Sequence, residues 1–166
     1  MRTRTSTRVL RVADEVWIAT ALLHRENPSR SDFSVEEIVE RAVQENLTGV
    51  NRPGVYAHAI SHCVANRPPS PNRCMMLLET GPGRRRLFRK GDTYDAARDG
   101  SKITPAREAI PDEYQALLTW YHDWSRDEGH LANDVDPLLS LAGSGAAIWA
   151  NESGDDYVRR LREGWE

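Results

Sequence analysis

The chain has 166 residues, 39% of them hydrophobic, and its 22 Lys and Arg against 25 Asp and Glu give a formal net charge of −3. This length suits one domain of ordinary size with a further segment. No apolar run approaches the roughly 20 residues of a membrane span, and no signal peptide is recognisable, so we expect a soluble, cytoplasmic protein without a membrane partner. The two cysteines, Cys63 and Cys74, fit no disulfide framework, and we expect them to be reduced core residues.

The charge is unevenly distributed along the chain. Residues 1–107 carry 18 basic and 12 acidic side chains, a net +6, whereas residues 108–166 carry 4 and 13, a net −9. A basic front half suits a polyanion, and an acidic rear half suits a basic protein partner or the protein's own solubility. A chance imbalance of solvated faces is the simpler alternative. Residues 1–13 are expected to form a flexible basic arm.

Three helices are predicted in the front half. The first covers residues 14–24 and ends before Asn27-Pro28, because a residue that precedes proline avoids the helical region. The second begins at a capping box formed by Ser34 and Glu37. The third begins near Pro53, a residue favoured in a first helical turn.

A basic β-hairpin is predicted after the third helix. The prolines of residues 68–71 end that helix, residues 74–79 resemble a buried strand, and residues 80–83 form a turn. The return strand starts at Arg84 and places Arg84 and Arg86 on one face, and Arg85 with Leu87 on the other.

This order of elements is typical of a winged helix. We therefore predict a mostly α protein with a small β-hairpin, of class α+β. Its winged helix-turn-helix domain covers residues 14–107, an additional helix covers residues 108–130, and an extended, acidic, partner-binding tail covers residues 131–166.

A winged helix with a basic hairpin is usually a DNA-binding module. The exposed face of the third helix carries small and hydrogen-bonding side chains, which a major groove accepts, and the consecutive arginines of the turn repel one another unless they contact phosphates. The predicted contacts with double-stranded operator DNA are Arg52, His58, Ser61, His62, Asn66, Arg67, Arg84, Arg85, Arg86 and Arg89. The basic residues Arg98, Lys102 and Arg107 would extend the phosphate contacts. A solvated arginine cluster is the alternative.

The predicted helix near Pro111 has an aromatic-rich stripe. Packing against the front domain is the favoured interpretation, and a homodimer interface is the alternative. The residues of this stripe are Tyr114, Leu117, Leu118, Tyr121 and Trp124.

The last 31 residues carry the pattern Leu-x-Gly-x-Gly-x-x-Ile-Trp, an acidic spacer, and Tyr-Val-x-x-Leu-Arg-x-x-Trp. Short apolar patches separated by glycines cannot build a core, which indicates a segment that folds on a partner. The pattern resembles the C-terminal toxin-binding tail of VapB-type antitoxins, which are encoded beside PIN-domain ribonuclease toxins. The resemblance rests on Leu141, Gly143, Gly145, Ile148, Trp149, Tyr157, Val158, Leu161, Arg162 and Trp165.

The resemblance implies that aromatic and aliphatic side chains of the tail fill grooves of the toxin. It also implies that Arg159, Arg160 or Arg162 reaches the toxin's acidic, metal-binding active site, where a guanidinium pairs with carboxylates. One feature departs from the family, because common VapB antitoxins bind DNA through a ribbon-helix-helix or swapped-hairpin domain. The implied toxin-binding residues are Leu138, Leu141, Ile148, Trp149, Tyr157, Val158, Arg159, Arg160, Leu161, Arg162 and Trp165.

Together the two halves predict a type II antitoxin that binds operator DNA and neutralises a PIN-domain ribonuclease without catalysis of its own. The alternatives are a free-standing winged-helix transcription regulator whose tail closes a homodimer, a winged-helix protein-interaction module and, last, an enzyme. No cofactor or metal is expected. His58 and His62 lie one helical turn apart, but Cys63 faces away from them, and the glycine turns lack the P-loop lysine and the dinucleotide fingerprint.

Overall fold

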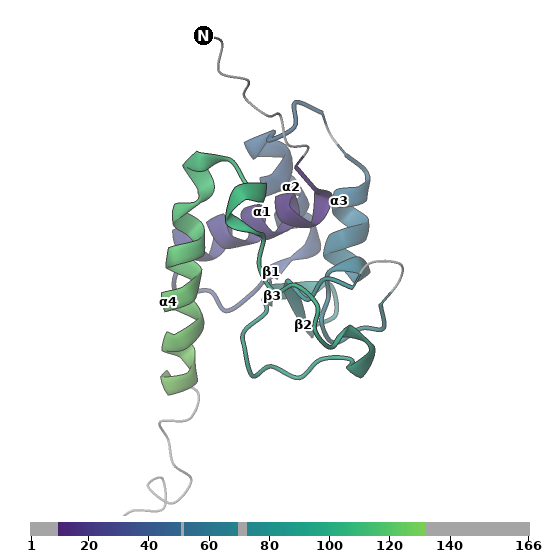
Figure 1. Ribbon diagram of the computed structural model, residues 1–166, viewed down its shortest axis with the longest axis vertical. Helices are drawn as coiled ribbons and strands as arrows, with labels where there is room; N and C mark the ends of the chain where they lie inside the picture. Colours follow the sequence, from purple (N-terminus) through teal and green to yellow (C-terminus); the bar gives the residue numbers. More distant parts are fainter. Residues whose placement is uncertain (1–9, 51, 70–72, 132–166) are drawn as a thin grey trace, which may run out of the picture. The chain divides into compact units, whose positions relative to one another are not determined.

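The structure is a computed structural model that describes residues 10–50, 52–69 and 73–131 (Figure 1). The described residues up to Ser125 belong to one compact unit, and the packing described below is that of this unit. The predicted tail, residues 131–166, lies outside the described residues apart from Leu131, and so does most of the predicted basic arm. The elements in chain order are α1 (Val12–Glu26), β1 (Phe33–Ser34), α2 (Val35–Glu45), α3 (Gly54–Ala57), a π-helical turn η1 (His58–His62), β2 (Leu77–Gly81), β3 (Arg84–Leu87), 3-10 turns at Ala96–Arg98, Arg107–Ala109 and Asp112–Tyr114, and α4 (Ala116–Leu131).

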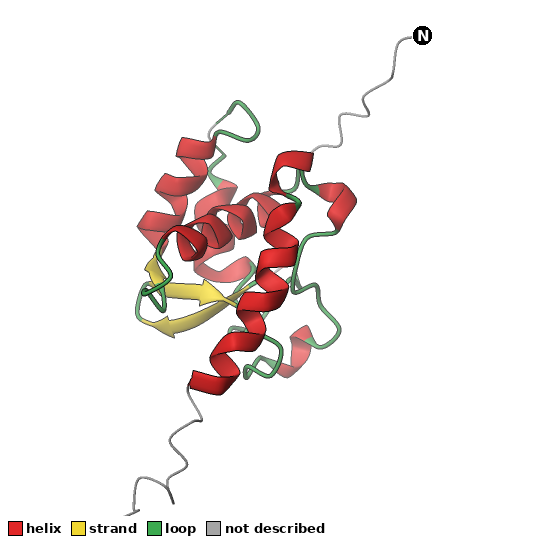
Figure 2. Ribbon diagram, turned by 90° about the vertical axis from the view of Figure 1, so that its left-hand side faces the viewer, coloured by secondary structure: helices red, strands yellow, loops and turns green. Residues whose placement is uncertain are grey.

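The short strands form an antiparallel sheet in the order β1-β3-β2, beside the helices (Figure 2). Phe33 of β1 pairs with Arg85 of β3, and Leu77 of β2 pairs with Leu87 at the other side of the same strand. The expected alternation along β3 is confirmed, since Arg85 and Leu87 are buried while Arg84 and Arg86 are half-buried. The described residues therefore have the predicted α+β character.

The predicted capping box at the start of α2 is confirmed. The backbone N–H of Glu37 donates to Oγ of Ser34 at 3.1 Å, and the backbone N–H of Ser34 donates to Oε2 of Glu37 at 2.8 Å. Both bonds are local, so the sequence spacing alone specifies them. The helix ends at Asn46, which adopts a left-handed φ of 48°.

The third helix differs from the continuous helix that the sequence predicts. After one α-helical turn the backbone widens into the π-helical turn, where the N–H of Cys63 donates to the carbonyl of His58 at 3.1 Å. A π turn shifts the hydrogen-bonding register by one residue and is unfavourable unless other groups support it. Buried arginines from elsewhere in the chain provide this support, as described below.

The core lies around α1, whose Val16, Trp17 and Ile18 are fully buried. Tyr121 of α4 meets Trp17 edge-to-face, with ring centroids 5.7 Å apart. Leu117 of α4 is also buried in this cluster. The aromatic stripe of α4 thus packs against the front domain, as the favoured interpretation predicted. No helix among the described residues is long and apolar enough to cross a membrane.

The expectation of two reduced thiols is wrong, because Cys63 and Cys74 form a disulfide. The chain turns back after η1, so that the segment before β2 lies beside the end of the third helix. This brings the two Cα atoms to 4.8 Å, within the range that a disulfide bridges. A sequence separation of eleven residues gave no indication of this approach.

Candidate functional site

The hairpin arginines that point outward are paired with carboxylates. Arg84 donates from Nε to Oδ1 of Asp32 at 2.7 Å, and its side chain is 42% exposed. Arg86 makes a bidentate pair with Asp92 at 2.7 and 2.6 Å and is 15% exposed. The positive charge expected at the turn is therefore balanced locally, and the mutual repulsion of the arginines is relieved without phosphates.

Arg85, predicted to contact DNA, is fully buried, so this prediction is wrong. It shares the buried face of β3 with Leu87, and its guanidinium reaches the third helix. Its Nε and Nη2 donate to the carbonyls of Ala59 and Ile60, each at 3.1 Å. Burial lowers the pKa of Arg85 from its ordinary value, and nearby Glu79 acts in the opposite direction. The side chain satisfies carbonyls that the π turn leaves without helical partners.

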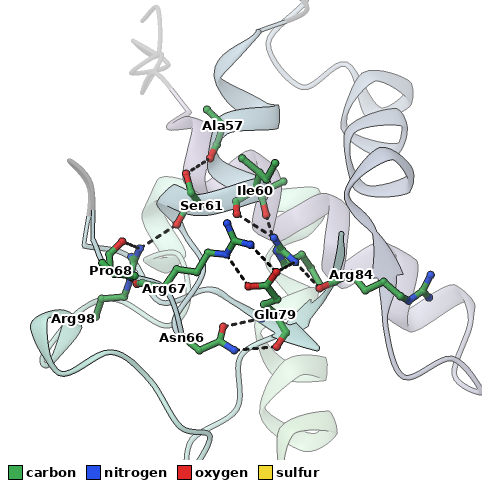
Figure 3. Close-up of polar contacts among 11 residues, drawn as sticks. Ala57, Ile60, Ser61, Asn66, Arg67, Pro68, Glu79, Arg84 and Arg98 are labelled. Atoms are coloured by element: carbon green, nitrogen blue, oxygen red, sulfur yellow. Dashed lines mark hydrogen bonds and ion pairs between the residues drawn. The ribbon is translucent and has the colours of Figure 1, made fainter. Parts of the chain in front are cut away.

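Arg67 and Asn66 are held by the same acidic residue of β2. Arg67 donates to both carboxylate oxygens of Glu79 at 2.7 Å. The Asn66 amide bonds the Glu79 backbone twice, donating to its carbonyl and accepting from its N–H at 2.9 Å. Figure 3 shows this group beside the helix end at Ile60 and Ser61. These contacts fasten the segment after the third helix to the sheet, and the pair with Arg67 lowers the pKa of Glu79.

Arg98 is also fully buried, so the expectation that it extends the phosphate contacts is wrong. Its guanidinium donates to five backbone carbonyls at 2.6–3.2 Å. Five acceptors match the five N–H donors of a guanidinium. Arg98 therefore joins the loop of residues 92–102 to the end of the third helix (Figure 3). The acceptors are the carbonyls of Ser61, His62, Arg67, Pro68 and Cys74.

The helix face expected in a major groove is only partly accessible. His58, Ser61 and His62 are half-buried. Nδ1 of His58 lies 2.8 Å from the carbonyl of Gly54, and burial lowers the pKa of His58. Ser61 donates to the carbonyl of Ala57 at 3.3 Å. Ala65, just after the third helix, is fully buried.

The remaining predicted DNA contacts also have partners within the domain. Arg52 donates to Oε2 of Glu15 and to the carbonyl of Leu10, which joins the start of α3 to α1. The guanidinium of Arg89 lies over the ring of Trp124, 4.0 Å from its centroid. The implied toxin-binding residues, from Leu138 to Trp165, lie outside the described residues.

A second candidate site was missed by sequence reasoning. A cavity of about 690 Å³ lies where the start of α1, His58, and two loop segments meet. It is lined by Leu10–Asp14, Arg52, His58, Arg73, Cys74, Met76 and Asp99–Lys102. These segments are far apart in the sequence, so no motif or spacing could have indicated the site.

No group of three or more His, Cys, Asp or Glu side chains that could hold a metal ion occurs among the described residues. No protein-family model, curated protein sequence or solved structure matches the chain.

Proposed function

We propose that the protein is an antitoxin whose C-terminal segment, residues 136–166, neutralises a PIN-domain ribonuclease. The observation that supports this most directly is the pattern of apolar, glycine and arginine residues that ends in Tyr157-Val158 and Leu161-Arg162. It follows a front domain that has its own core.

Neutralisation needs no chemistry from this chain. Apolar side chains such as Trp149 and Trp165 bury surface on the toxin, and an arginine such as Arg162 pairs with the carboxylates that hold the toxin's catalytic metal. A guanidinium suits that site because its planar fork bonds a carboxylate through two N–H groups. The acidic spacer at Asp155-Asp156 adds attraction to any basic surface of the toxin.

Deletion of residues 136–166 tests this proposal. A chain ending at Val135 keeps the whole front domain and should fail to relieve the growth arrest caused by the PIN-domain ribonuclease encoded beside it. The single changes Trp149→Ala and Trp165→Ala should each weaken neutralisation, because large aromatic anchors dominate such interfaces. Full neutralisation by the truncated chain would contradict the proposal.

We further propose that the front domain is a winged helix. The order α1-β1-α2-α3-β2-β3 with the sheet order β1-β3-β2 supports this. In that fold the third helix enters the major groove and the β2–β3 turn approaches the phosphates. Such a domain would allow the antitoxin to bind its operator.

One observation favours a protein-interaction role for this winged helix over DNA binding. Arg84 and Arg86 each face a carboxylate, Asp32 and Asp92, and Arg67 faces Glu79. A phosphate must displace these acids, and they repel it while they remain nearby. The hairpin thus presents much less net positive charge than its sequence indicates.

The salt dependence of DNA affinity separates these two roles. Operator binding through the hairpin predicts that Arg84→Ala with Arg86→Ala lowers the slope of log affinity against log salt by up to about 0.9 per lost phosphate contact. Arg25→Ala, which removes an exposed arginine of α1, serves as the control. An unchanged slope would mean that the hairpin makes no phosphate contacts. The absence of measurable DNA binding would favour the protein-interaction role.

A further inference from the structure

The cations that line the cavity at the start of α1 differ from the hairpin arginines in whether carboxylates already pair with them. Arg11, Arg73 and Lys102 line it and are exposed. No ion pair joins any of the three to another residue of the described part of the chain. In the hairpin, by contrast, the outward arginines are already matched by carboxylates. The cavity is therefore where accessible positive charge converges.

The walls of the cavity are largely apolar. Leu10 and Met76 are buried, and Val12 and Ala13 of the first turn of α1 are half-buried. His58, which is half-buried, also lines the cavity. Burial of an apolar part of a ligand against such a surface is favourable. The cations at the rim would pair with a charged group of the same ligand.

Acidic groups in the cavity reduce its positive charge without cancelling it. Asp14 and Asp99 belong to the lining. Asp14 is buried, and this burial raises its pKa, with opposite contributions from Lys102 and Arg11. Asp99 is exposed and accepts a hydrogen bond from the hydroxyl of Tyr94 at 3.0 Å. Arg52, the fourth cation of the lining, is held by Glu15.

The start of α1 adds a further positive contribution. Arg11 is the N-cap residue of this 15-residue helix, and its side chain makes no capping bond. The first N–H groups of a helix carry a partial positive charge that attracts anions. This contribution supports the three side-chain cations and would be insufficient by itself.

We propose that this cavity binds a small organic anion, with a phosphate or carboxylate group at the cationic rim and an apolar body of about one ring against Met76 and Ala13. Its volume of about 690 Å³ falls in the range of roughly 300–1,000 Å³ of ligand sites. The cations come from three separate segments of the domain, so an anion bound there links the start of α1 to both loops. Among the described residues, none of β2 or β3 lines this cavity, and the inference does not depend on the proposed antitoxin activity.

Titration of the full chain with four probes tests the inference, with amide chemical shifts of Leu10–Asp14 as the readout. The probes are phenyl phosphate, benzoate, inorganic phosphate and benzyl alcohol. We expect at least one aromatic anion to saturate these shifts and to bind at least tenfold more tightly than benzyl alcohol. Inorganic phosphate should bind more weakly than phenyl phosphate. The preference between phenyl phosphate and benzoate then identifies the charged group.

Two variants assign the binding to the cavity. The double change Arg73→Glu and Lys102→Glu should lower the affinity for the aromatic anion at least tenfold. The control Lys90→Glu with Arg107→Glu changes exposed cations outside the lining and should leave this affinity within twofold of the native value. Amide shifts of the core residues Val16 and Ile18 check that both variants fold. If neither aromatic anion binds, if benzyl alcohol binds equally well, or if both variants behave alike, the inference is overturned. A misfolded Arg73/Lys102 variant is replaced by Arg73→Gln with Lys102→Gln, for which we expect at least a threefold loss.

Discussion

Arg85 of β3 and Glu79 of β2 are paired across the sheet, with Nη1 of Arg85 3.2 Å from Oε1 of Glu79. The same guanidinium reaches the carbonyls of Ala59 and Ile60 in the third helix. One side chain therefore connects both strands of the hairpin to the helix end. An arginine in the middle of a basic run thus stabilises the fold of the domain.

Replacing Arg85 should cost much of the domain's stability. Arg85→Met leaves the carbonyls of Ala59 and Ile60 buried without donors, and each buried acceptor left unsatisfied typically costs about 1–3 kcal/mol. Arg85→Lys should recover little of this, because an ammonium lacks the fork that reaches two carbonyls at once. Urea denaturation measures the effect.

The control for this series is Arg25→Ala, which changes an exposed arginine and should alter the free energy of unfolding by less than about 0.5 kcal/mol. A loss below about 1 kcal/mol in Arg85→Met, less than the cost of leaving two buried acceptors unsatisfied, would mean that the buried guanidinium is not needed for folding.

Arg98→Lys should loosen one part of the domain more than the rest. Residues 92–102 are held by the Arg98 guanidinium and by backbone bonds such as that from the N–H of Met75 to the carbonyl of Lys102 at 2.7 Å. Loss of the fork should speed hydrogen exchange at the amides of Met75 and Asp95 at least tenfold. Amides in the middle of α1, such as that of Ile18, should change much less, and uniform acceleration throughout the domain would contradict this local role.

These two arginines show where sequence reasoning succeeded and where it failed. The alternation along β3 correctly placed Arg85 with the buried Leu87, and that was already a signal against a phosphate contact. The acceptors of Arg85 lie 25 and 26 residues away, at the end of the third helix, where the backbone widens into a π turn. A local pattern cannot reveal either fact.

Local interactions were predicted well because sequence patterns report on residues that are close in the chain. The capping box at Ser34 and the alternation in β3 depend on neighbours within four residues, whereas the Cys63–Cys74 disulfide and the cavity depend on how distant segments meet. The outward arginines, Arg84 and Arg86, are paired with Asp32 and Asp92. The net charge of residues 1–107 indicated a basic surface because a sum over the segment does not show which charges pair.

The capping box gives a pH-dependent prediction. Hydrogen bonding to Arg30, then to the Ser34 backbone, lowers the pKa of Glu37 from 4.5 to about 2, against the effect of partial burial. A lowered pKa stabilises the fold above pH 4.5, and this contribution is lost as the pH falls through about 2. Because the pair is partly exposed, solvent screening limits its value to about 1 kcal/mol.

Glu37→Gln should therefore lower the free energy of unfolding at pH 7, and the difference from the native chain should shrink below pH 4.5. Ser34→Ala should cost about 1 kcal/mol at every pH above 4.5, because it removes an acceptor that does not titrate. Denaturant titrations at pH 7 and pH 3 measure both. A pH-independent difference for Glu37→Gln would contradict the role of its charge.

Tyr121 provides a test of how α4 is fixed to the core. Its hydroxyl donates to the carbonyl of Phe88, and burial, followed by the charge of Asp92, raises its pKa to about 12. A raised tyrosine pKa gives stability that is present below pH 10 and is lost as the pH rises through about 12.

Tyr121→Phe should cost about 1 kcal/mol near pH 7 and should reduce the loss of stability between pH 10 and pH 12. Tyr94→Phe, at an exposed tyrosine, is the matched control and should have a much smaller effect. Equal effects of the two changes would show that the bond to Phe88 contributes little.

We propose that residues 136–166 bind a PIN-domain ribonuclease and that the front domain folds without them. A pull-down from the native host, with the full chain and with a chain ending at Val135, tests this, with the bound proteins identified by mass. We expect the full chain to recover a small PIN-domain protein and the truncated chain, folded as judged by its amide spectrum, to recover none. Equal recovery by both chains, or no PIN-domain protein with either, would contradict the proposal.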